Sequence, residues 1–219
     1  MDAPDLAPGV YATVLRDLAQ VNSLTLARRP TLAFLTRALS GMRGFRLLDV
    51  GFGDGDMLRS IARWAQRRGI TAELVGIDLN PGSAPAARAH TPPGMPIDWR
   101  TGDYADLAGS GFDVVISSLV AHHMTHDQLV AFVRFMAREA RVAWLVNDLH
   151  RHRLAAIGFP ALATLMRWHP IVRHDGALSI ARSYRPREWL PILDEAGIAP
   201  GTARVFRAFP FRLCVEQIH

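Results

Sequence analysis

Short strand-like segments alternate with amphipathic stretches along most of the chain. Strands are predicted over residues 46–51, 73–79, 97–101, 112–117 and 140–149. Apolar residues at helical spacing predict helices over residues 11–20, 29–39, 57–68, 85–90 and 127–138. Because strands that alternate with helices form parallel sheets covered on both faces, the pattern predicts an α/β fold.

The C-terminal third breaks this alternation. Residues 150–184 show no clear period and are expected to be irregular and partly helical. A helix is predicted over residues 186–196, and two strands follow within residues 201–218. Such a final pair commonly closes a Rossmann-like sheet with an antiparallel member. We therefore expect an N-terminal helical cap over residues 1–44 and one domain over residues 45–219, with a lid insertion around residues 150–184.

Composition narrows the class of protein. Apolar residues make up 49% of the 219 residues, enough for a sizeable core. No apolar run reaches the length of about 18 residues that indicates a transmembrane helix. The first residues lack the basic stretch and apolar run of a signal peptide, and a single cysteine, Cys214, is typical of a reducing compartment. We therefore expect a cytoplasmic protein.

The net charge of +5 raises the question of a nucleic-acid partner. All 25 basic residues are arginine and lysine is absent, a bias typical of a GC-rich bacterial genome. The arginines are scattered, and the densest clusters are the pairs Arg28–Arg29 and Arg67–Arg68. We interpret them as a solvated surface and expect no nucleic-acid partner.

The strongest local motif is a strand that runs into a glycine-rich turn at residues 47–55. Glycines at positions 51, 53 and 55 let the backbone turn sharply and approach a ligand closely, and the helix that follows offers free N–H groups. Asp49, inside the motif, would repel the pyrophosphate of a dinucleotide but suits the cationic amino-acid end of S-adenosylmethionine (SAM). A tight turn without a ligand is the alternative.

Two further acids follow strands. Asp78, at the end of the second strand, can accept hydrogen bonds from both ribose hydroxyls of a nucleoside; capping a helix is the alternative. Asp103, after the third strand, can accept the amino group of adenine, and Tyr104 can stack beside that ring. An Asx-type turn is the alternative for Asp103.

The order of these motifs, with the apolar strand that ends at Ser117 and Ser118, resembles that of class I SAM-dependent methyltransferases over residues 45–149. The resemblance implies a Rossmann-like, mostly parallel seven-stranded sheet with helices on both faces and an antiparallel last strand. It also implies SAM as cofactor and S-adenosylhomocysteine (SAH) as product. The cofactor-binding residues it implies are Asp49, Gly51, Phe52, Gly53 and Gly55 at the methionine part, Asp78 and Leu79 at the ribose, Asp103 and Tyr104 at the adenine, and Ser118 and Leu119 beside the sulfonium.

Histidines supply the candidate bases. His122 and His123 follow the fourth strand, and His122 matches the position where plant-type O-methyltransferases of phenols place a catalytic histidine. Packing or capping of the next helix is the alternative. His174, beside Asp175, is a candidate second base or orienting group, with a polar loop as the alternative. A metal site is not expected, because adjacent histidines point apart and no ligand set completes one.

The acceptor is expected to be a small, aromatic or polyketide-like molecule of secondary metabolism. The apolar stretch at residues 154–168 resembles the lid insertions of small-molecule methyltransferases, although ordinary helix packing explains it as well. The leading hypothesis is O-methylation of a phenol with a histidine base. A C-methyltransferase for quinone-type substrates, an RNA methyltransferase and a non-catalytic SAM-binding protein remain alternatives. The sequence also leaves a homodimer open.

Overall fold

The structure, a computed structural model, describes residues 21, 22 and 24–219, so the helix predicted over residues 11–20 lies outside the described part. The strands are β1 (Gly44–Val50), β2 (Thr71–Asp78), β3 (Ile97–Thr101), β4 (Phe112–Ser118), β5 (Ala140–Leu149), β6 (Arg204–Ala208) and β7 (Arg212–Ile218). The helices are α2 (Arg29–Ala38), α3 (Asp56–Arg68), α4 (Ser83–Ala89), α5 (His126–Glu139), α6 (Arg153–Leu165), α7 (Pro170–Arg182) and α8 (Trp189–Glu195). Short 3₁₀ turns lie at η1 (Tyr104–Leu107), η2 (Ala121–His123) and η3 (Pro186–Glu188).

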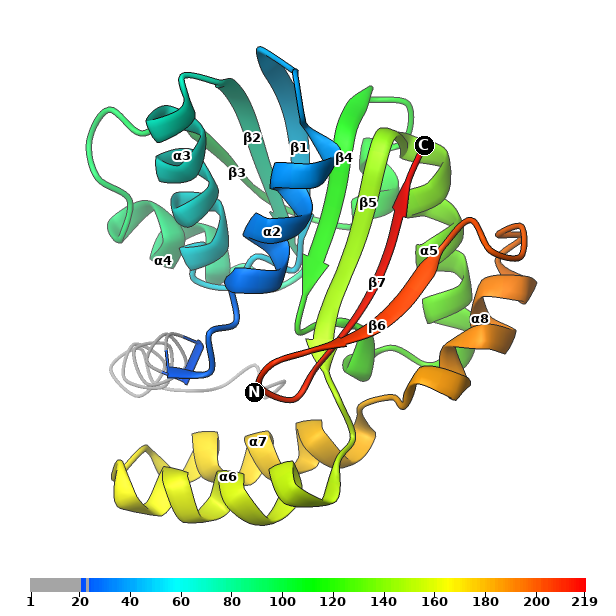
Figure 1. Cartoon of the computed structure of the whole chain (residues 1–219). Helices are drawn as coiled ribbons and strands as arrows, with labels where there is room; N and C mark the ends of the chain where they lie inside the picture. The colour runs from blue at the N-terminus through cyan, green and yellow to red at the C-terminus, as the bar shows by residue number, and fades with distance from the viewer. Residues whose placement is uncertain (1–20, 23) are drawn as a thin grey trace.

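The strands form one seven-stranded sheet in the order β3-β2-β1-β4-β5-β7-β6 (Figure 1). Neighbours from β3 to β5 are parallel, whereas β7 is antiparallel to both β5 and β6. The predicted fold class is therefore confirmed. Because β1, β4 and β5 run in the same direction, their carboxyl ends meet at one edge of the sheet, where ligands of open α/β sheets bind.

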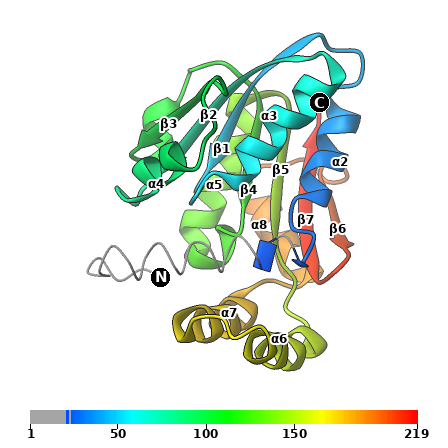
Figure 2. The same ribbon diagram turned by 90° about the vertical axis from the view of Figure 1, so that its left-hand side faces the viewer.

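Helices cover both faces of the sheet (Figure 2). On one face, Phe34 of α2 and Leu58 of α3 are buried in the same apolar cluster as residues of β1. On the other face, Phe132 of α5 and Trp189 of α8 are buried in a second cluster. Because its apolar stripe is buried with that of α3, α2 belongs to this helical layer. The N-terminal helical cap expected over residues 1–44 stays a prediction.

Helix α3 begins and ends at the residues that local signals predict. It starts directly after the glycine-rich turn, with Asp56 in its first turn, and Arg67 and Arg68 lie in its last turn. Both placements complement the helix dipole. Gly69 ends the helix in the left-handed conformation, with a φ of 66°. The N-terminus of α3 is thereby fixed at the carboxyl end of β1.

Residues 150–184 were predicted to be irregular and partly helical, and most of them form a hairpin of the two helices α6 and α7. The buried residues of the two helices are few, namely Ala155, Ala163, Val172 and Ile180. With so few inward-facing positions, the sequence carries no clear helical period, and Pro160 inside α6 obscures it further. The hairpin lies across the carboxyl ends of β4 and β5 (Figures 1 and 2).

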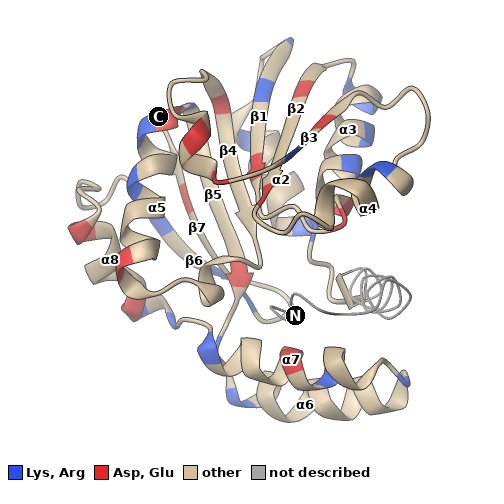
Figure 3. Cartoon of the chain, turned by 180° about the vertical axis from the view of Figure 1, so that it is seen from behind, with Lys and Arg blue, Asp and Glu red and all other residues tan. Residues whose placement is uncertain are grey.

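The surface shows neither a long apolar helix nor one dominant charge. Among the described residues, no helix is both long enough and apolar enough to cross a membrane. Seen from behind, acidic and basic residues are interspersed over the helices and strands (Figure 3). This distribution matches the scattered arginines of the sequence.

Candidate active site

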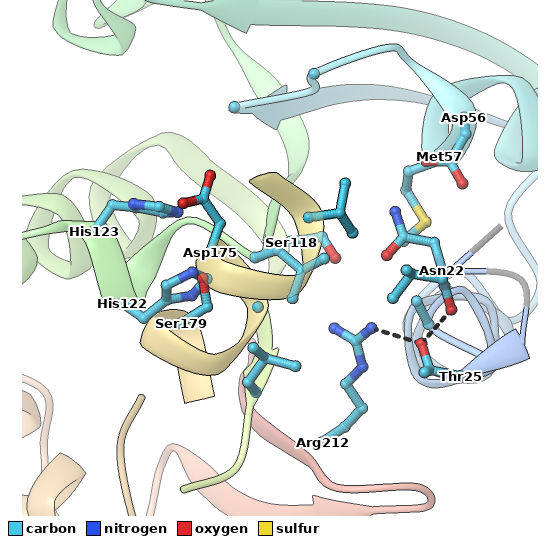
Figure 4. A pocket seen from close by; sticks show the side chains of 18 of the residues that line it. Asn22, Thr25, Asp56, Met57, Ser118, His122, His123, Asp175, Ser179 and Arg212 are labelled. Atoms are coloured by element: carbon cyan, nitrogen blue, oxygen red, sulfur yellow. Dashed lines mark hydrogen bonds between the residues drawn. The ribbon is translucent and has the colours of Figure 1, made fainter. Parts of the chain in front are cut away.

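A cavity of about 260 Å³ opens at the carboxyl ends of β1, β4 and β5. Its wall combines the glycine-rich turn after β1, the turn after β4, residues 21–28 before α2, the inner side of α7 and Arg212 at the start of β7. Figure 4 shows their side chains converging from opposite sides. Parts of the chain that lie far apart in sequence therefore form one pocket at the edge of the sheet where ligands are expected.

The carboxylate of Asp49 stands in this wall without a partner. Asp49 is 1% exposed, and within the described residues neither of its carboxylate oxygens accepts a hydrogen bond. Burial raises the pKa of Asp49 well above its usual value, and the charges of Asp56 and Asp78 raise it further. A buried anion without a partner is unfavourable. The carboxylate of Asp49 therefore lacks a cationic partner, and the ammonium group of a ligand fits beside it.

The acids beside Asp49 differ from it in having cations of their own. Asp54 accepts a hydrogen bond from the guanidinium of Arg59 at 3.0 Å. Asp56 lies 3.7 Å from the guanidinium of Arg28. Asp49 is thus the acid of this group whose charge the described residues leave unbalanced, and its contact with the amino group of a cofactor stays a prediction.

The glycines of the turn have different roles. Gly51 and Gly53 line the pocket, together with Phe52. A β-carbon on Gly53, whose φ is 58°, would meet no atom within 4 Å, whereas one on Gly55 would come within 2.3 Å of the Trp99 ring. Gly55 was predicted to flank the cofactor, but it lies outside the pocket lining. Its lack of a side chain makes room for the Trp99 ring.

Replacing Gly55 or Gly53 by alanine is expected to affect the stability of the chain and its affinity for SAH to different extents. Gly55→Ala should lower the free energy of unfolding by about 2 kcal/mol or more, because it adds a collision with Trp99 to the strain of a positive φ. Gly53→Ala should add only the strain, about 1–2 kcal/mol, and should weaken SAH binding more. Thermal melts and calorimetric titration with SAH measure the two effects. Equal destabilisation by both changes would contradict the packing role of Gly55.

The acid after β2 holds the glycine-rich turn in place. Oδ2 of Asp78 accepts a hydrogen bond from the Gly53 N–H at 2.9 Å, and Oδ1 accepts one from the Asn80 N–H at 2.9 Å. Leu79 is 73% exposed. Both residues stand beside the lining of the pocket and not in it. Their contact with a cofactor ribose stays a prediction.

Asp103, the acid after β3, forms an Asx-type turn, which was the alternative to its contact with adenine. Oδ1 of Asp103 accepts a hydrogen bond from the Ala105 N–H at 2.9 Å and thereby starts η1. The ring of Tyr104 packs against Phe132 and Phe135, with centroids 4.9 and 4.8 Å away. Burial raises the pKa of Tyr104. These contacts occupy part of both side chains, and their contact with adenine stays a prediction.

The turn after β4 brings Ser118 and Leu119 into the pocket wall, where the sulfonium was predicted. Leu119 has a φ of 63°, a conformation that costs a bulky residue about 1–2 kcal/mol. Its N–H donates to the carbonyl of Asn147 at the carboxyl end of β5. The strained residue turns the chain sharply from β4 into η2, and η2 carries the next two histidines.

His122 is buried in the pocket wall and is fixed by Asp148 on β5. Nδ1 of its ring lies 2.7 Å from Oδ1 of Asp148, and its backbone N–H donates to Oδ2 of the same carboxylate at 2.9 Å. The two side chains are 3% and 4% exposed. Burial alone would raise the pKa of Asp148, but His122 and hydrogen bonds from the backbone N–H groups of His122 and Leu149 lower it overall.

This contact sets the protonation of the ring. An ionised carboxylate only accepts hydrogen bonds, so Nδ1 of His122 carries a proton. In a neutral ring Nε2 then has a free lone pair. His122 is thus prepared to accept a proton through Nε2, and Asp148 is placed to stabilise the positive charge that results.

The other candidate histidines are placed differently. His123 also lines the pocket, is exposed, and points toward the same region as Asp175 (Figure 4). Its ring lies against that of His122, with centroids 4.2 Å apart, so our expectation that the adjacent histidines point apart is wrong. The 3₁₀ turn places the two rings together. His174 is exposed on α7 and lies outside the lining, whereas its neighbour Asp175 lines the pocket.

No metal cluster is found in the part of the chain that the structure describes, searched as groups of three or more histidine, cysteine or acidic side chains.

Sequence reasoning missed the function of the residues at the end of β5. Residues 147–149 were predicted as the end of the strand over residues 140–149 and do lie within β5, but no contact was assigned to their side chains. Successive side chains of a strand point to opposite faces. Asn147 therefore donates to the Ala27 carbonyl on one face, and Asp148 holds His122 on the other. An acid at the end of a buried strand, the signal used for Asp49, would have marked Asp148.

The fold and the pocket together define a protein class. Its features are the strand order with an antiparallel seventh strand, the glycine-rich turn after β1, and an acid after β2 that holds this turn. These three features are typical of class I methyltransferases. Comparison with known proteins agrees, because residues 47–142 match the family model described as methyltransferase domain. Residues 47–142 are therefore similar to a methyltransferase domain, and the sheet has the class I methyltransferase fold.

Two relatives are ubiquinone biosynthesis O-methyltransferases. The protein from Cereibacter sphaeroides is 30% identical over 164 residues, which cover 72% of this chain and 62% of that relative. The protein from Ruegeria pomeroyi is 29% identical over 193 residues, which cover 77% of this chain and 70% of the relative. The chain thus matches about two thirds of the length of these relatives.

Among solved structures, the plantazolicin methyltransferase BpumL, crystallised with a triazolic desmethylPZN analog and SAH, superposes with a TM-score of 0.66. The match covers 95% of each chain at 13% identity. This similarity concerns the fold.

Proposed function

We propose that the chain transfers a methyl group from SAM to a hydroxyl of a small aromatic acceptor, with His122 as general base. The observation that carries the proposal is the pair of buried groups in one pocket, the unpartnered carboxylate of Asp49 and the His122–Asp148 pair. One suits a cationic amino-acid group and the other suits removal of a proton. A methyl transfer from SAM to a hydroxyl needs both.

The residues around β1 would hold the cofactor. SAM supplies a methyl group on a positively charged sulfur, which makes that carbon open to attack by a nucleophile. Asp49 would bind the ammonium, and the backbone of Gly51 and Gly53 would lie against the methionine part, since both glycines line the pocket. The neighbouring Asp78 keeps this turn in position through the Gly53 N–H.

The residues after β4 would prepare the acceptor. A hydroxyl becomes a strong nucleophile when its proton leaves, and Nε2 of His122 is the position that can take this proton. Asp148 would stabilise the resulting imidazolium through Nδ1. Because the bidentate contact with Asp148 fixes both the ring and the backbone of His122, the base has one orientation toward the pocket.

The nature of the acceptor is inferred from the wall opposite β4. Phe159 of α6 and Val172, Leu178 and Ile180 of α7 line the pocket with apolar surface. Such a wall favours an apolar or aromatic body over a sugar or a nucleic acid. The names of the ubiquinone-pathway relatives favour a hydroxyl on an aromatic or quinone-type ring. A cytoplasmic location, a homodimer and the absence of a nucleic-acid partner stay predictions.

A product analysis tests the proposal. The purified chain is incubated with SAM and a panel of catechols, hydroquinones and hydroxybenzoates, and products are examined by mass spectrometry and NMR. We expect transfer to oxygen. Transfer to a ring carbon would instead favour the quinone-type C-methyltransferase. Tight SAH binding without turnover on any acceptor would favour a non-catalytic SAM-binding protein, and salt-sensitive binding to RNA would favour an RNA methyltransferase.

A further inference from the structure

A second charged side chain in the pocket lacks an ion-pair partner among the described residues, and its sign is opposite to that of Asp49. Arg212 is 1% exposed and lines the pocket. Figure 4 shows its guanidinium reaching into the space between the cofactor end and the histidines. Arg212 opens β7 and pairs in register with Leu149. It therefore lies at the same edge of the sheet as Asp148.

The hydrogen-bond donors of Arg212 are largely unmet. Nη2 donates to the hydroxyl of Thr25 at 3.3 Å. Within the described residues, Nε and Nη1 have no hydrogen-bond partner, and no acidic side chain forms an ion pair with this guanidinium within 4.0 Å. Burial lowers the pKa of Arg212, and the charges of Asp148, Cys214 and Asp56 oppose this shift. Since arginine keeps its proton in proteins, the group remains a buried cation.

A comparison within the chain shows that this state is unusual. Arg59 is the other arginine among the buried residues that the structure describes. Its guanidinium donates to the carboxylate and to the backbone carbonyl of Asp54. Buried charges are normally paired in this way, because an isolated one is strongly unfavourable. Arg212 therefore lacks an anion that a bound molecule can supply.

We propose that Arg212 binds a carboxylate of the methyl acceptor. The inference rests on the proposed function for the identity of the occupant. Asp49 lies on β1 and Arg212 on β7, with β4 and β5 between them. At about 4.8 Å per strand, the two backbones are roughly 14 Å apart. His122 follows β4 on η2 and Asp148 lies on β5, so a molecule anchored at Arg212 lies beside the base.

The chemistry of the acceptor follows from this placement. A carboxylate at Arg212 would accept from the unmet donors of the guanidinium, because the hydroxyl of Thr25 already donates to the Val21 carbonyl. An apolar ring attached to it would meet Leu149, which pairs in register with Arg212 and lines the same pocket. A hydroxyl on the ring then points toward His122. The class of acceptor is a hydroxylated aromatic carboxylic acid.

The guanidinium of Arg212 could instead bind the methionine carboxylate of SAM. The experiment separates the carboxylate of the acceptor from that of the cofactor. The SAH-loaded protein is titrated calorimetrically with 3,4-dihydroxybenzoate, 4-hydroxybenzoate and the methyl ester of each. In the wild type, at least one acid is expected to bind about 10-fold more tightly than its ester. Arg212→Met should abolish this preference. Arg182→Met, at an exposed arginine that also lines the pocket, is the matched control and should preserve it.

Three results would overturn the proposal. The first is that no acid binds better than its ester, and the second is that the preference survives in Arg212→Met. The third is a loss of SAH affinity of about 10-fold or more in Arg212→Met while the affinity for methylthioadenosine, which lacks the amino acid, is unchanged. That result would assign Arg212 to the cofactor. Binding preference without methyl transfer would contradict the proposed function and leave this inference standing.

Thermal melting guards against a folding artefact. Methionine has nearly the length of arginine and no charge, and replacing a buried unpaired ion by an apolar group is neutral or stabilising. We therefore expect the melting temperature of ligand-free Arg212→Met to equal or exceed that of the wild type. A lower value would mean that Arg212 is a structural residue with its partner inside the protein, and the proposal would be wrong.

Discussion

Replacing His122 by alanine is expected to lower kcat for methyl transfer by about 10²–10⁴-fold, the usual contribution of a general base. The acceptor hydroxyl would lose a buried imidazole in the pocket wall whose Nε2 is prepared to take its proton. SAH affinity should stay within about twofold of the wild type, because the cofactor end of the pocket lies at β1. Initial rates, with the best acceptor of the panel, and calorimetric titration with SAH measure the two effects.

The neighbouring side chains provide the controls. His123→Ala removes an exposed ring of the same pocket and should reduce kcat less than tenfold. The reverse order of effects would make His123 the base. Asp148→Asn keeps the size of the positioning residue but removes its charge, so the ring of His122 loses its fixed proton on Nδ1. We expect a lower kcat with an altered pH profile and little change in KM. An unaltered pH profile would contradict the positioning role.

Asp49→Asn is expected to weaken SAH binding about 30-fold or more. Removing one partner of a buried charge pair costs about 2–5 kcal/mol, and each 1.4 kcal/mol is tenfold in Kd. Asparagine keeps the size of the side chain, so the fold should not change. Calorimetric titration measures the effect. Asp54→Asn, at an acid of the same turn that already has Arg59 as its cation, is the control and should weaken binding less. Equal losses would contradict the assignment.

The pH dependence of the stability of the ligand-free chain should report on the protonation of Asp49. The pKa of Asp49 is raised in the folded state, so the folded chain retains a proton that the unfolded chain releases above about pH 3.9. Asp49 therefore contributes stability below that pH and loses it as the pH rises through the folded-state pKa. Thermal melts of the wild type should fall relative to Asp49→Asn across this range. A constant difference at all pH values would mean that the carboxylate has a partner.

The core of the fold could be predicted because its signals are local. The apolar run of residues 112–118 identifies a buried strand without reference to the rest of the chain, and Gly69 marks the end of α3 in the same way. The signal for the proposed cofactor site is also local, since Asp49 and the glycines that follow are neighbours in the sequence. Their chemistry could therefore be interpreted before the structure was known.

The acceptor end depends on contacts between distant residues. His122 and Asp148 are 26 positions apart, and the register of β4 against β5, which pairs Ser118 with Asn147, brings them together. Arg212 is one of 25 arginines, and no feature of the sequence marks it as buried. Only the antiparallel pairing of β7 with β5 places it in the pocket. His174 is the opposite case. Its neighbour Asp175 made it a candidate in the sequence, but His174 is exposed on α7 and lies outside the pocket lining.

The bridge between His150 and Tyr184 gives the hairpin α6–α7 a modular character. Both ends of the hairpin meet at this one point, where the Arg151 N–H also donates to the Tyr184 carbonyl. The hairpin has a small cluster of its own, around Trp168 and Val172. Evolution can therefore lengthen, shorten or exchange this segment without shifting any strand. A new acceptor can be accommodated in this way while the residues for the methyl donor remain unchanged.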